Sequence, residues 1–386
     1  MNAGFDLQDC NLESFRDLTE RTLDPAELRF ASGIDKNIPV YSMPELGAAL
    51  SEPGARRSLL REWAEVLHDL SGVLVLKGAY RDTAVLDEAT EVYQAVIGRE
   101  KAAGEVAADH FAKAGANDRI WNSLEKLCRE NPDVFARYFS NVPVAAVCEA
   151  WLGPNYQMTS QINVVHPGGQ AQEAHRDYHL GFQSEGVAAS YPVHTHLLSA
   201  ALTLQGAIAH CDMPLESGPT KLLPFSQLYP QGYIAFRRPA FRAYFEAACV
   251  QLPLSKGDAV FFNPALFHAA GENRSAQIER MANLLQVSSA FGRAMESVDR
   301  RHLCTLVYPV VKENIAAGKI SPLEVDALIA ATAEGYAFPT NLDTDPPVGG
   351  LAPDSQADLF RQALETGQSP DAFSDALSQQ AARRAP

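Results

Sequence analysis

The middle of the chain constrains the fold most, because residues 155–292 read as short β-rich runs with helical segments on either side. Gly, Pro and polar turn residues separate these runs, which are YQMTSQINVV, LLSAALTLQGAIAH, TKLLPFS, DAVFFNPALFH and RMANLLQVSSAF. Short strands divided by such turns predict a β-sandwich or a barrel. A cupin-type jelly roll is one of the architectures that this pattern allows.

The flanks have a helical texture. Apolar residues recur at helical spacing in residues 58–70, and residues 83–103 and 119–152 also read as mainly helical, with the short strand GVLVLKGAY between the first two. Helical patterns return after residue 295. The last thirty residues carry one amphipathic run, DLFRQALE, and we expect the remaining tail to be frayed.

We therefore expect a mainly β core with flanking helices (α+β) in one compact domain. Its expected parts are an N-terminal leader packing on the core (residues 1–60), helices plus a jelly-roll core (61–295), and a C-terminal helical extension and tail (296–386).

Composition limits the classes of partner. The formal net charge of −15 argues against a nucleic-acid or anionic-membrane surface, because both select basic patches. No stretch resembles a signal peptide or a membrane span. The six cysteines are scattered without a CxxC pair, which favours reduced thiols in a cytoplasmic protein.

The stretch QEAHRDYHLGF contains a candidate metal-binding pair, His175 and Asp177. Side chains two apart on a strand point to the same face, so this pair would present an imidazole and a carboxylate together. These are two of the three ligands in the 2-His-1-carboxylate triad of non-haem iron oxygenases. A second pair with the same spacing, His210 and Asp212, competes for the role.

A second informative stretch lies downstream, at residues 252–288. His268 follows a hydrophobic strand, and it is distant enough in sequence from His175 to complete a ligand set from the other end of a sandwich. Arg280 opens the next strand. Its guanidinium fork matches the geometry of a carboxylate and could clamp a dicarboxylate co-substrate. Arg274, in the turn GENRS, is the alternative, although we expect it to face water.

The order of GVLVLKGAY, YQMTSQINVVHPGG, AHRDYHLGF, CDMPLESGPTKLLPFSQ, FHAAGENRS and Arg280 resembles the phytanoyl-CoA dioxygenase family of iron(II)/2-oxoglutarate oxygenases over roughly residues 70–290. The resemblance implies a double-stranded β-helix (jelly-roll) core. It also implies iron(II) held by His175, Asp177 and His268, with 2-oxoglutarate and O₂ as co-substrates. Arg280 would hold the C5 carboxylate of 2-oxoglutarate and Asn163 would contact it. Gln161, two residues earlier on the same strand face, would look into the pocket.

Parts of the chain depart from the family pattern. PFSQ replaces the usual PGSH, residues 183–200 look like an elongated lid, and the last 90 residues have no counterpart in the smaller members. We expect Arg176 to be structural and to point away from the ligands. We expect His179, His194 and His196 to be surface residues near the mouth of the pocket, with contact to a lid or substrate as the alternative. Candidates for the apolar lining of the pocket are Phe261, Phe262 and Phe267, which ordinary core packing would explain equally well.

The predicted function is an iron(II)- and 2-oxoglutarate-dependent dioxygenase that hydroxylates, or otherwise oxidises, a small-molecule substrate and releases succinate and CO₂. The alternatives are a cupin-type metal-dependent hydrolase or isomerase, and a non-catalytic jelly-roll binding protein. HExxH, GxSxG, GxGxxG and P-loop motifs are absent. The substrate and the oligomeric state stay open, a homo-oligomer included.

Overall fold

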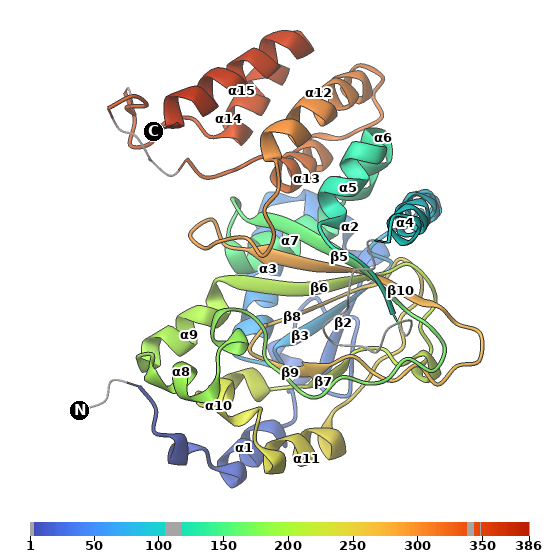
Figure 1. Ribbon diagram of the computed structural model, residues 1–386, viewed down its shortest axis with the longest axis vertical. Helices are drawn as coiled ribbons and strands as arrows, with labels where there is room; N and C mark the ends of the chain where they lie inside the picture. Colours follow the sequence, from blue (N-terminus) through green and yellow to red (C-terminus); the bar gives the residue numbers. More distant parts are fainter. Residues whose placement is uncertain (1–3, 105–116, 338–342, 348, 386) are drawn as a thin grey trace.

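A computed structural model describes residues 4–104, 117–337, 343–347 and 349–385. Its centre is an eight-stranded sheet in the order β1-β2-β3-β8-β6-β10-β5-β4 (Figure 1). Among the strand pairs of the described ranges, β2 with β3 is the parallel one and the others are antiparallel. The strands are β1 (Gly33–Asp35), β2 (Ile38–Ser42), β3 (Val73–Lys77), β4 (Asn117–Ile120), β5 (Gln157–Val165), β6 (Thr203–Ala209), β8 (Ala259–Phe262) and β10 (Arg280–Ser288).

A smaller sheet faces the large one. It consists of β7 (Lys221–Leu223) and β9 (Phe267–Ala269), and it is widened by single bridges from His175 to His268 and from Leu222 to Val250. Apolar side chains of β3, β6 and β8 meet Leu222 between the two sheets. Two facing sheets with helices outside give the mainly β core with flanking helices that the sequence predicts, a double-stranded β-helix.

Helices cover the outer face of the large sheet (Figure 1). On this face, residues such as Leu74, Phe261 and Leu285 pack into one core with the helices. The helices are α2 (Met43–Ser51), α3 (Pro53–His68), α4 (Ala84–Ala102), α5 (Ser123–Glu130), α6 (Pro132–Phe139), α7 (Val142–Leu152), α12 (Arg300–Ala316), α13 (Pro322–Thr332), α14 (Gln356–Glu365) and α15 (Pro370–Arg384).

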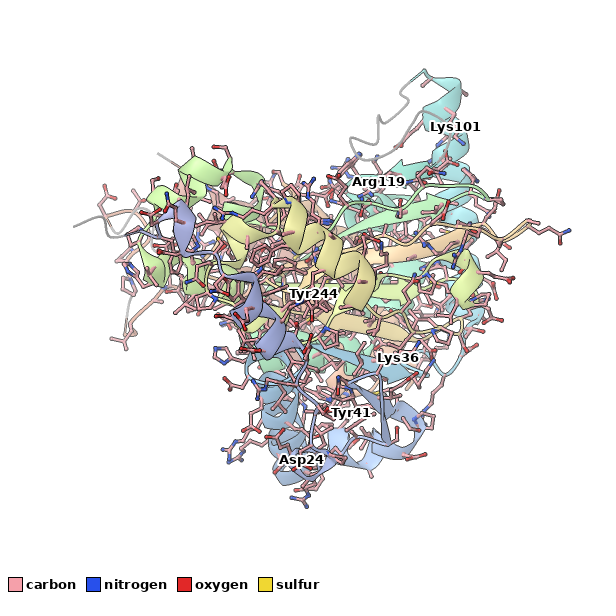
Figure 2. The ribbon with its side chains drawn as sticks, turned by 90° about the horizontal axis from the view of Figure 1, so that it is seen from below. Asp24, Lys36, Tyr41, Lys101, Arg119 and Tyr244 are labelled. Atoms are coloured by element: carbon pink, nitrogen blue, oxygen red, sulfur yellow. The ribbon has the colours of Figure 1, made fainter. Side chains whose placement is uncertain are left out.

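A second helical layer backs the small sheet. Phe15 and Phe245 pack there against Phe267, and the Tyr244 hydroxyl is 2.8 Å from the Thr19 hydroxyl. Figure 2 shows this side of the molecule, with Tyr244 labelled. The helices are α1 (Leu12–Thr19), α10 (Gly232–Ala235) and α11 (Pro239–Ala248), and α8 (Glu185–Ser190) and α9 (Val193–Ala201) lie beyond them.

The structure corrects several expected element boundaries. Residues 1–60 contain two strands that were not expected there, β1 and β2, which extend the large sheet. Within LLSAALTLQGAIAH, the first residues belong to helix α9 and only Thr203–Ala209 form a strand. Residues 119–152 begin inside a strand, β4, that the sequence reading assigned to helix.

The expected frayed tail is also wrong. Ser369 caps helix α15 by accepting a hydrogen bond from the backbone N–H of Ala372, and Pro370 occupies the first turn. Phe373 and Leu377, one turn apart on this helix, are both buried in the main core. Two large apolar residues are enough to dock α15, because helices α12 and α14 supply the apolar surface against which they pack. The three-part division of the chain stays a prediction.

Candidate metal centre and cavity

Backbone pairing brings the two predicted histidine ligands together. The N–H of His175 donates to the carbonyl of His268 at 3.0 Å, and the N–H of His268 donates back at 3.2 Å. The Asp177 N–H continues the pairing to the carbonyl of Pro264 at 3.2 Å. The extended segment 175–177 therefore runs beside β9, with His175 and Asp177 on one face.

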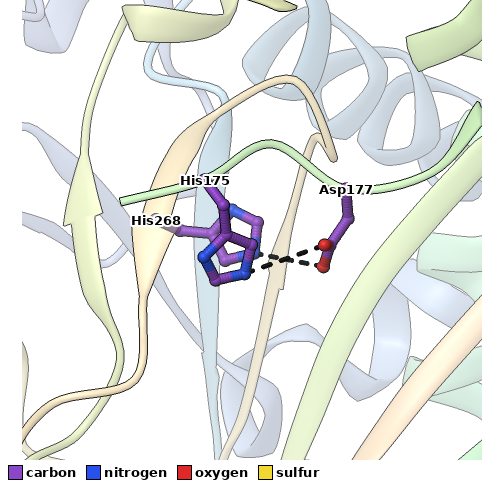
Figure 3. A group of neighbouring side chains, drawn as sticks. All are labelled: His175, Asp177 and His268. Carbon is purple, nitrogen blue, oxygen red and sulfur yellow. Dashed lines mark ion pairs between the residues drawn. The ribbon is translucent and has the colours of Figure 1, made fainter. Parts of the chain in front are cut away.

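The three side chains converge on one point (Figure 3). His175 Nε2 lies 3.7 Å from Asp177 Oδ1, and His268 Nε2 lies 3.4 Å from Asp177 Oδ2. One donor atom from each residue falls within 4.8 Å of the other two, which is close enough for one ion to contact all three. The geometry and the mixed nitrogen and oxygen donors fit a 2-His-1-carboxylate iron site.

Both imidazoles are fixed in the tautomer that a metal requires. The Nδ1 of His175 is 2.9 Å from the Glu173 carbonyl, and the Nδ1 of His268 is 2.9 Å from the Leu266 carbonyl. Because a carbonyl only accepts, Nδ1 carries the proton in each ring and Nε2 presents its lone pair to the centre. Burial also lowers the pKa of His175, which favours the neutral ligand.

Asp177 is held as an ionised carboxylate. Burial would raise its pKa, but the nearby imidazoles of His175 and His268 and the hydrogen bond from the amide of Gln205 outweigh burial and lower it. Gln205 Nε2 donates to Asp177 Oδ2 at 2.5 Å. Sequence reasoning missed Gln205, since a lone glutamine inside an apolar strand gives no signal until the strand pairing is known.

Arg176 points away from the two ligands that flank it, as predicted. Its guanidinium is buried, donates to the carbonyls of Ser226 and Tyr229, and lies over the rings of Tyr233 and Phe267. Burial lowers its pKa to about 10, so the group keeps its charge at neutral pH. A Cβ at residue 232 would lie 1.8 Å from the guanidinium carbon, so any larger residue at this position would displace the guanidinium.

The three candidate ligands line a cavity of about 160 Å³ between the two sheets. Side chains from the inner face of the large sheet form its opposite wall. These wall residues are Gln161, Asn163 and Val165 of β5, Gln205, Ala207 and Ala209 of β6, Val260 and Phe262 of β8, and Arg280, Ala282, Leu284 and Gln286 of β10.

Arg280 is a buried cation in this cavity. Its Nη1 donates to the carbonyls of Ser217 and Gly271, at 3.0 and 3.1 Å. Across the described ranges, no carboxylate lies within ion-pair distance of it. Burial lowers its pKa to about 10, which leaves the guanidinium charged at neutral pH. An anionic ligand is the partner that such a group lacks. The alternative, Arg274, is exposed and does not line the cavity.

Asn163 and Gln161 both face the cavity from β5, as their spacing predicts. The Oδ1 of Asn163 is buried without a hydrogen-bond partner in the part of the chain described. Gln161 Oε1 accepts a hydrogen bond from Arg119 Nη1 at 3.0 Å. Arg119 comes from β4 at the edge of the sheet, where Figure 2 labels it, and was not predicted because the strand itself was missed.

The competing pair, His210 and Asp212, does not form a metal site. Thr90 Oγ1 and Tyr138 OH each lie 2.8 Å from one ring nitrogen of His210, so both nitrogens are engaged. Burial lowers the pKa of His210 to about 3. Asp212 instead accepts from the backbone N–H of Lys256. This pair is structural.

The remaining predicted residues differ in whether they lie where the sequence places them. Of the three phenylalanines, only Phe262 lines the cavity; Phe261 packs under the helices, and Phe267 packs on the far side of the small sheet. His179 and His194 are exposed as expected. His196 was expected at the surface but is buried, with Nε2 3.0 Å from the Ala188 carbonyl.

The family of the chain follows from comparison with known proteins. Residues 57–282 match the model of the phytanoyl-CoA dioxygenase (PhyH) family. The match covers more than half of the chain, and the chain belongs to this family. Together with the fold and the His-Asp-His cluster, this defines an oxygenase of the iron/2-oxoglutarate type.

Two relatives are named as dioxygenases. Dioxygenase trt7 of Aspergillus terreus is 22% identical over 223 residues, which are 57% of this chain and 70% of that protein. Dioxygenase andF of Emericella variicolor is 28% identical over 139 residues, which are 35% of this chain and 43% of that protein.

Solved structures give more remote matches. The non-haem α-ketoglutarate-dependent epimerase SnoN from nogalamycin biosynthesis is 19% identical, with a TM-score of 0.40 over 62% of this chain and 84% of that one. EvdMO1 is 17% identical, with a TM-score of 0.43 over 60% of this chain and 50% of that one. At these TM-scores the superpositions do not define the chemistry of this chain.

Among the described residues, no helix combines the length and the apolar character needed to cross a bilayer.

Proposed function

We propose that the protein is an iron(II)- and 2-oxoglutarate-dependent oxygenase that hydroxylates, or otherwise oxidises with oxygen from O₂, a small molecule. One observation carries the proposal: a His-Asp-His cluster shares one cavity with a buried guanidinium that has no acidic partner among the described residues. The dioxygenase names of the two relatives support the same reaction class.

Each residue has a role in this proposal. His175, Asp177 and His268 hold the iron through Nε2, a carboxylate oxygen and Nε2. Arg280 binds the distal carboxylate of 2-oxoglutarate through the edge of its fork that the Ser217 and Gly271 carbonyls leave open. Asn163, with an unpartnered Oδ1 or, after an amide flip, an NH₂ group, hydrogen-bonds the same ligand.

Iron(II) in such a site couples oxidative decarboxylation of 2-oxoglutarate to succinate and CO₂ with oxidation of a substrate C–H bond. The chain's own contribution is to orient the ligands and exclude water. Phe262 and Leu284 supply apolar wall, and the ring of Phe262 lies 4.7 Å from that of His268.

Oxygen-derived oxidation is proposed over halogenation. Halogenation at an iron centre of this kind needs a small residue in place of the carboxylate ligand, which opens a position for chloride. Here Asp177 occupies that position and is kept ionised.

A hydrolase or isomerase using the same three ligands with zinc or manganese is the second candidate. The cluster by itself favours neither. That chemistry gives no reason for an unpaired guanidinium in the cavity, so binding of 2-oxoglutarate separates the two candidates. A non-catalytic binding protein would show no turnover with any substrate.

Anaerobic addition of iron(II) and 2-oxoglutarate tests the proposal. We expect a visible metal-to-ligand charge-transfer band that appears only when both are present. Arg280→Ala should require far more 2-oxoglutarate for the same band, whereas the exposed Arg274→Ala should not. Failure of the band at saturating iron and 2-oxoglutarate would overturn the proposal. Screening metabolites for stimulated succinate release then identifies the substrate.

A further inference from the structure

Gln205 connects the metal cluster to the cavity wall. It lies in the middle of the large sheet with 5% of its surface exposed, and its Nε2 donates to Asp177 Oδ2. An ionised carboxylate only accepts hydrogen bonds, so the amide nitrogen must face Asp177. This contact removes the usual ambiguity between the two ends of an amide and turns the Gln205 oxygen away from Asp177.

The oxygen of Gln205 is left without a donor. Oε1 is buried and has no hydrogen-bond partner within the described ranges. Gln286, its register partner on β10, is also buried with an unpartnered Oε1, and both residues line the cavity. Buried acceptors in folded proteins are almost always paired. A ligand that brings a hydrogen-bond donor into the cavity would complete this pair of amides.

The rest of the wall specifies the kind of donor. Asp177 is the one carboxylate among the described lining residues, and the proposed iron would neutralise it, whereas Arg119 and Arg280 are cationic. A cationic ammonium donor is therefore disfavoured, and a neutral hydroxyl is favoured. Apolar side chains make up much of the remaining wall, and Trp121, Phe182, Leu284 and Met295 are among them.

We propose that Gln205 determines substrate specificity: its Oε1 accepts a hydrogen bond from a hydroxyl group of an uncharged, largely apolar substrate, while its Nε2 positions Asp177. This inference rests on the proposed function, because it places the substrate beside the iron ligands. The substrate class is an alcohol, anchored through its hydroxyl so that neighbouring C–H bonds lie near the metal centre.

Matched alcohols and ethers test this assignment without knowledge of the natural substrate. The probes are cyclohexanol and borneol, each paired with its methyl ether, which accepts but cannot donate. Full-length protein is saturated with Mn(II) and 2-oxoglutarate under nitrogen, and relaxation of probe protons by the bound Mn(II) is followed by NMR. We expect each alcohol to bind about 5- to 10-fold more tightly than its ether, as for one neutral hydrogen bond.

Variants separate the hydrogen bond from the shape of the cavity. Gln205→Met keeps the length of the side chain but offers no amide acceptor, so the alcohol-to-ether ratio should fall to about one. Gln205→Glu should keep the preference, because its carboxyl, protonated by burial beside Asp177, can donate to Asp177 and still present a carbonyl oxygen as acceptor. Gln170→Met, at an exposed amide on the rim of the same cavity, is the matched control and should also keep it. All ratios are taken at Mn(II) concentrations that saturate each variant.

An equal ratio in Gln205→Met and wild type would overturn the assignment. So would the absence of any alcohol preference in the wild type, a result that needs no variant to fold. The outcome is distinct from the test of the proposed function: a charge-transfer band without alcohol preference would leave the oxygenase intact and remove only the role of Gln205. Alcohol preference without the band would keep the hydrogen bond between Gln205 and the hydroxyl of the ligand and would overturn the oxygenase proposal.

Discussion

The main chains of His175 and His268 are hydrogen-bonded to each other in both directions, and their rings lie 4.4 Å apart. The two residues are 93 positions apart in sequence. The isolated β-bridge between His175 and β9 therefore brings the candidate metal ligands together. His268 lies in strand β9, and the bridge fixes His175, which belongs to an irregular segment, beside it. The Nδ1 contact of each ring to a carbonyl two residues earlier then fixes the ring direction.

Removing a ligand should abolish metal binding. His268→Ala leaves one imidazole and one carboxylate, and we expect iron(II) affinity to fall by at least about 100-fold, since even supporting residues around metal ligands contribute 10- to 100-fold. Isothermal titration under nitrogen measures the loss. The exposed His194→Ala is the control and should bind iron like the wild type. Equal affinity in His268→Ala would show that the ion binds elsewhere.

Arg280 should govern affinity for 2-oxoglutarate. Truncation to alanine should cost about 2–5 kcal/mol in binding, which is typical when one partner of a buried charge pair is lost. Arg280→Lys should recover only part of this loss, because an ammonium cannot reproduce the two-pronged contact of a guanidinium. Titration of the charge-transfer band gives the three constants. An unchanged affinity in Arg280→Ala would refute the assignment.

His210 should make stability depend on pH. Its folded-state pKa is about 3, against 6.5 for an ordinary histidine, because burial excludes the charged form. Between these values the unfolded chain binds a proton that the folded chain does not, so stability falls as pH decreases. The slope for this group is about 1.4 kcal/mol per pH unit. Urea unfolding of His210→Gln between pH 4 and pH 6 should lack this slope, while His194→Gln should keep it.

The terminal helix should contribute to stability. Phe373 is fully buried against Tyr308, with ring centroids 4.4 Å apart, so Phe373→Ala should lower the free energy of unfolding by about 3–5 kcal/mol. Ser378→Ala on the exposed side of the same helix should change it little. Chemical unfolding compares the two variants. A small effect of Phe373→Ala would mean that α15 is not docked in solution.

The products should carry oxygen rather than halogen. With ¹⁸O₂, chloride and a substrate found by the succinate screen, mass spectrometry should detect label in succinate and, for a hydroxylation, at least partly in the product. Asp177→Gly removes a ligand and its charge together and should abolish hydroxylation. A chlorinated product from the unmodified protein would refute the role of Asp177.

Local patterns predicted much of the fold and most of the candidate site. The strands β3, β5, β8 and β10 could be read directly, since their apolar runs are long or end in clear turns. The spacing of His175 and Asp177 correctly predicted that their side chains lie on one face, and β10 begins at Arg280 as expected. Strand β4 could not be read, because NDRI is polar and becomes a strand only by pairing with β5 at the sheet edge.

Residues that act through tertiary contacts stayed hidden. Gln205 matters because of what faces it across the cavity, and no spacing rule records that contact. Helix α15 likewise depends on a wall built by α12 and α14. The rejection of His210 needed the structure too, since its two ring nitrogens are engaged by residues 72 and 120 positions away.

The position of Arg176 between two candidate ligands also specifies the register in which segment 175–177 pairs with β9. Side chains alternate across an extended chain, so a slip by one residue would turn the guanidinium into the cavity and both ligands out of it. The misaligned chain would bury a cation beside Arg280 and leave the carbonyls of Ser226 and Tyr229 without their donor. Only one alignment satisfies both faces, so misfolded forms with a shifted segment are strongly disfavoured.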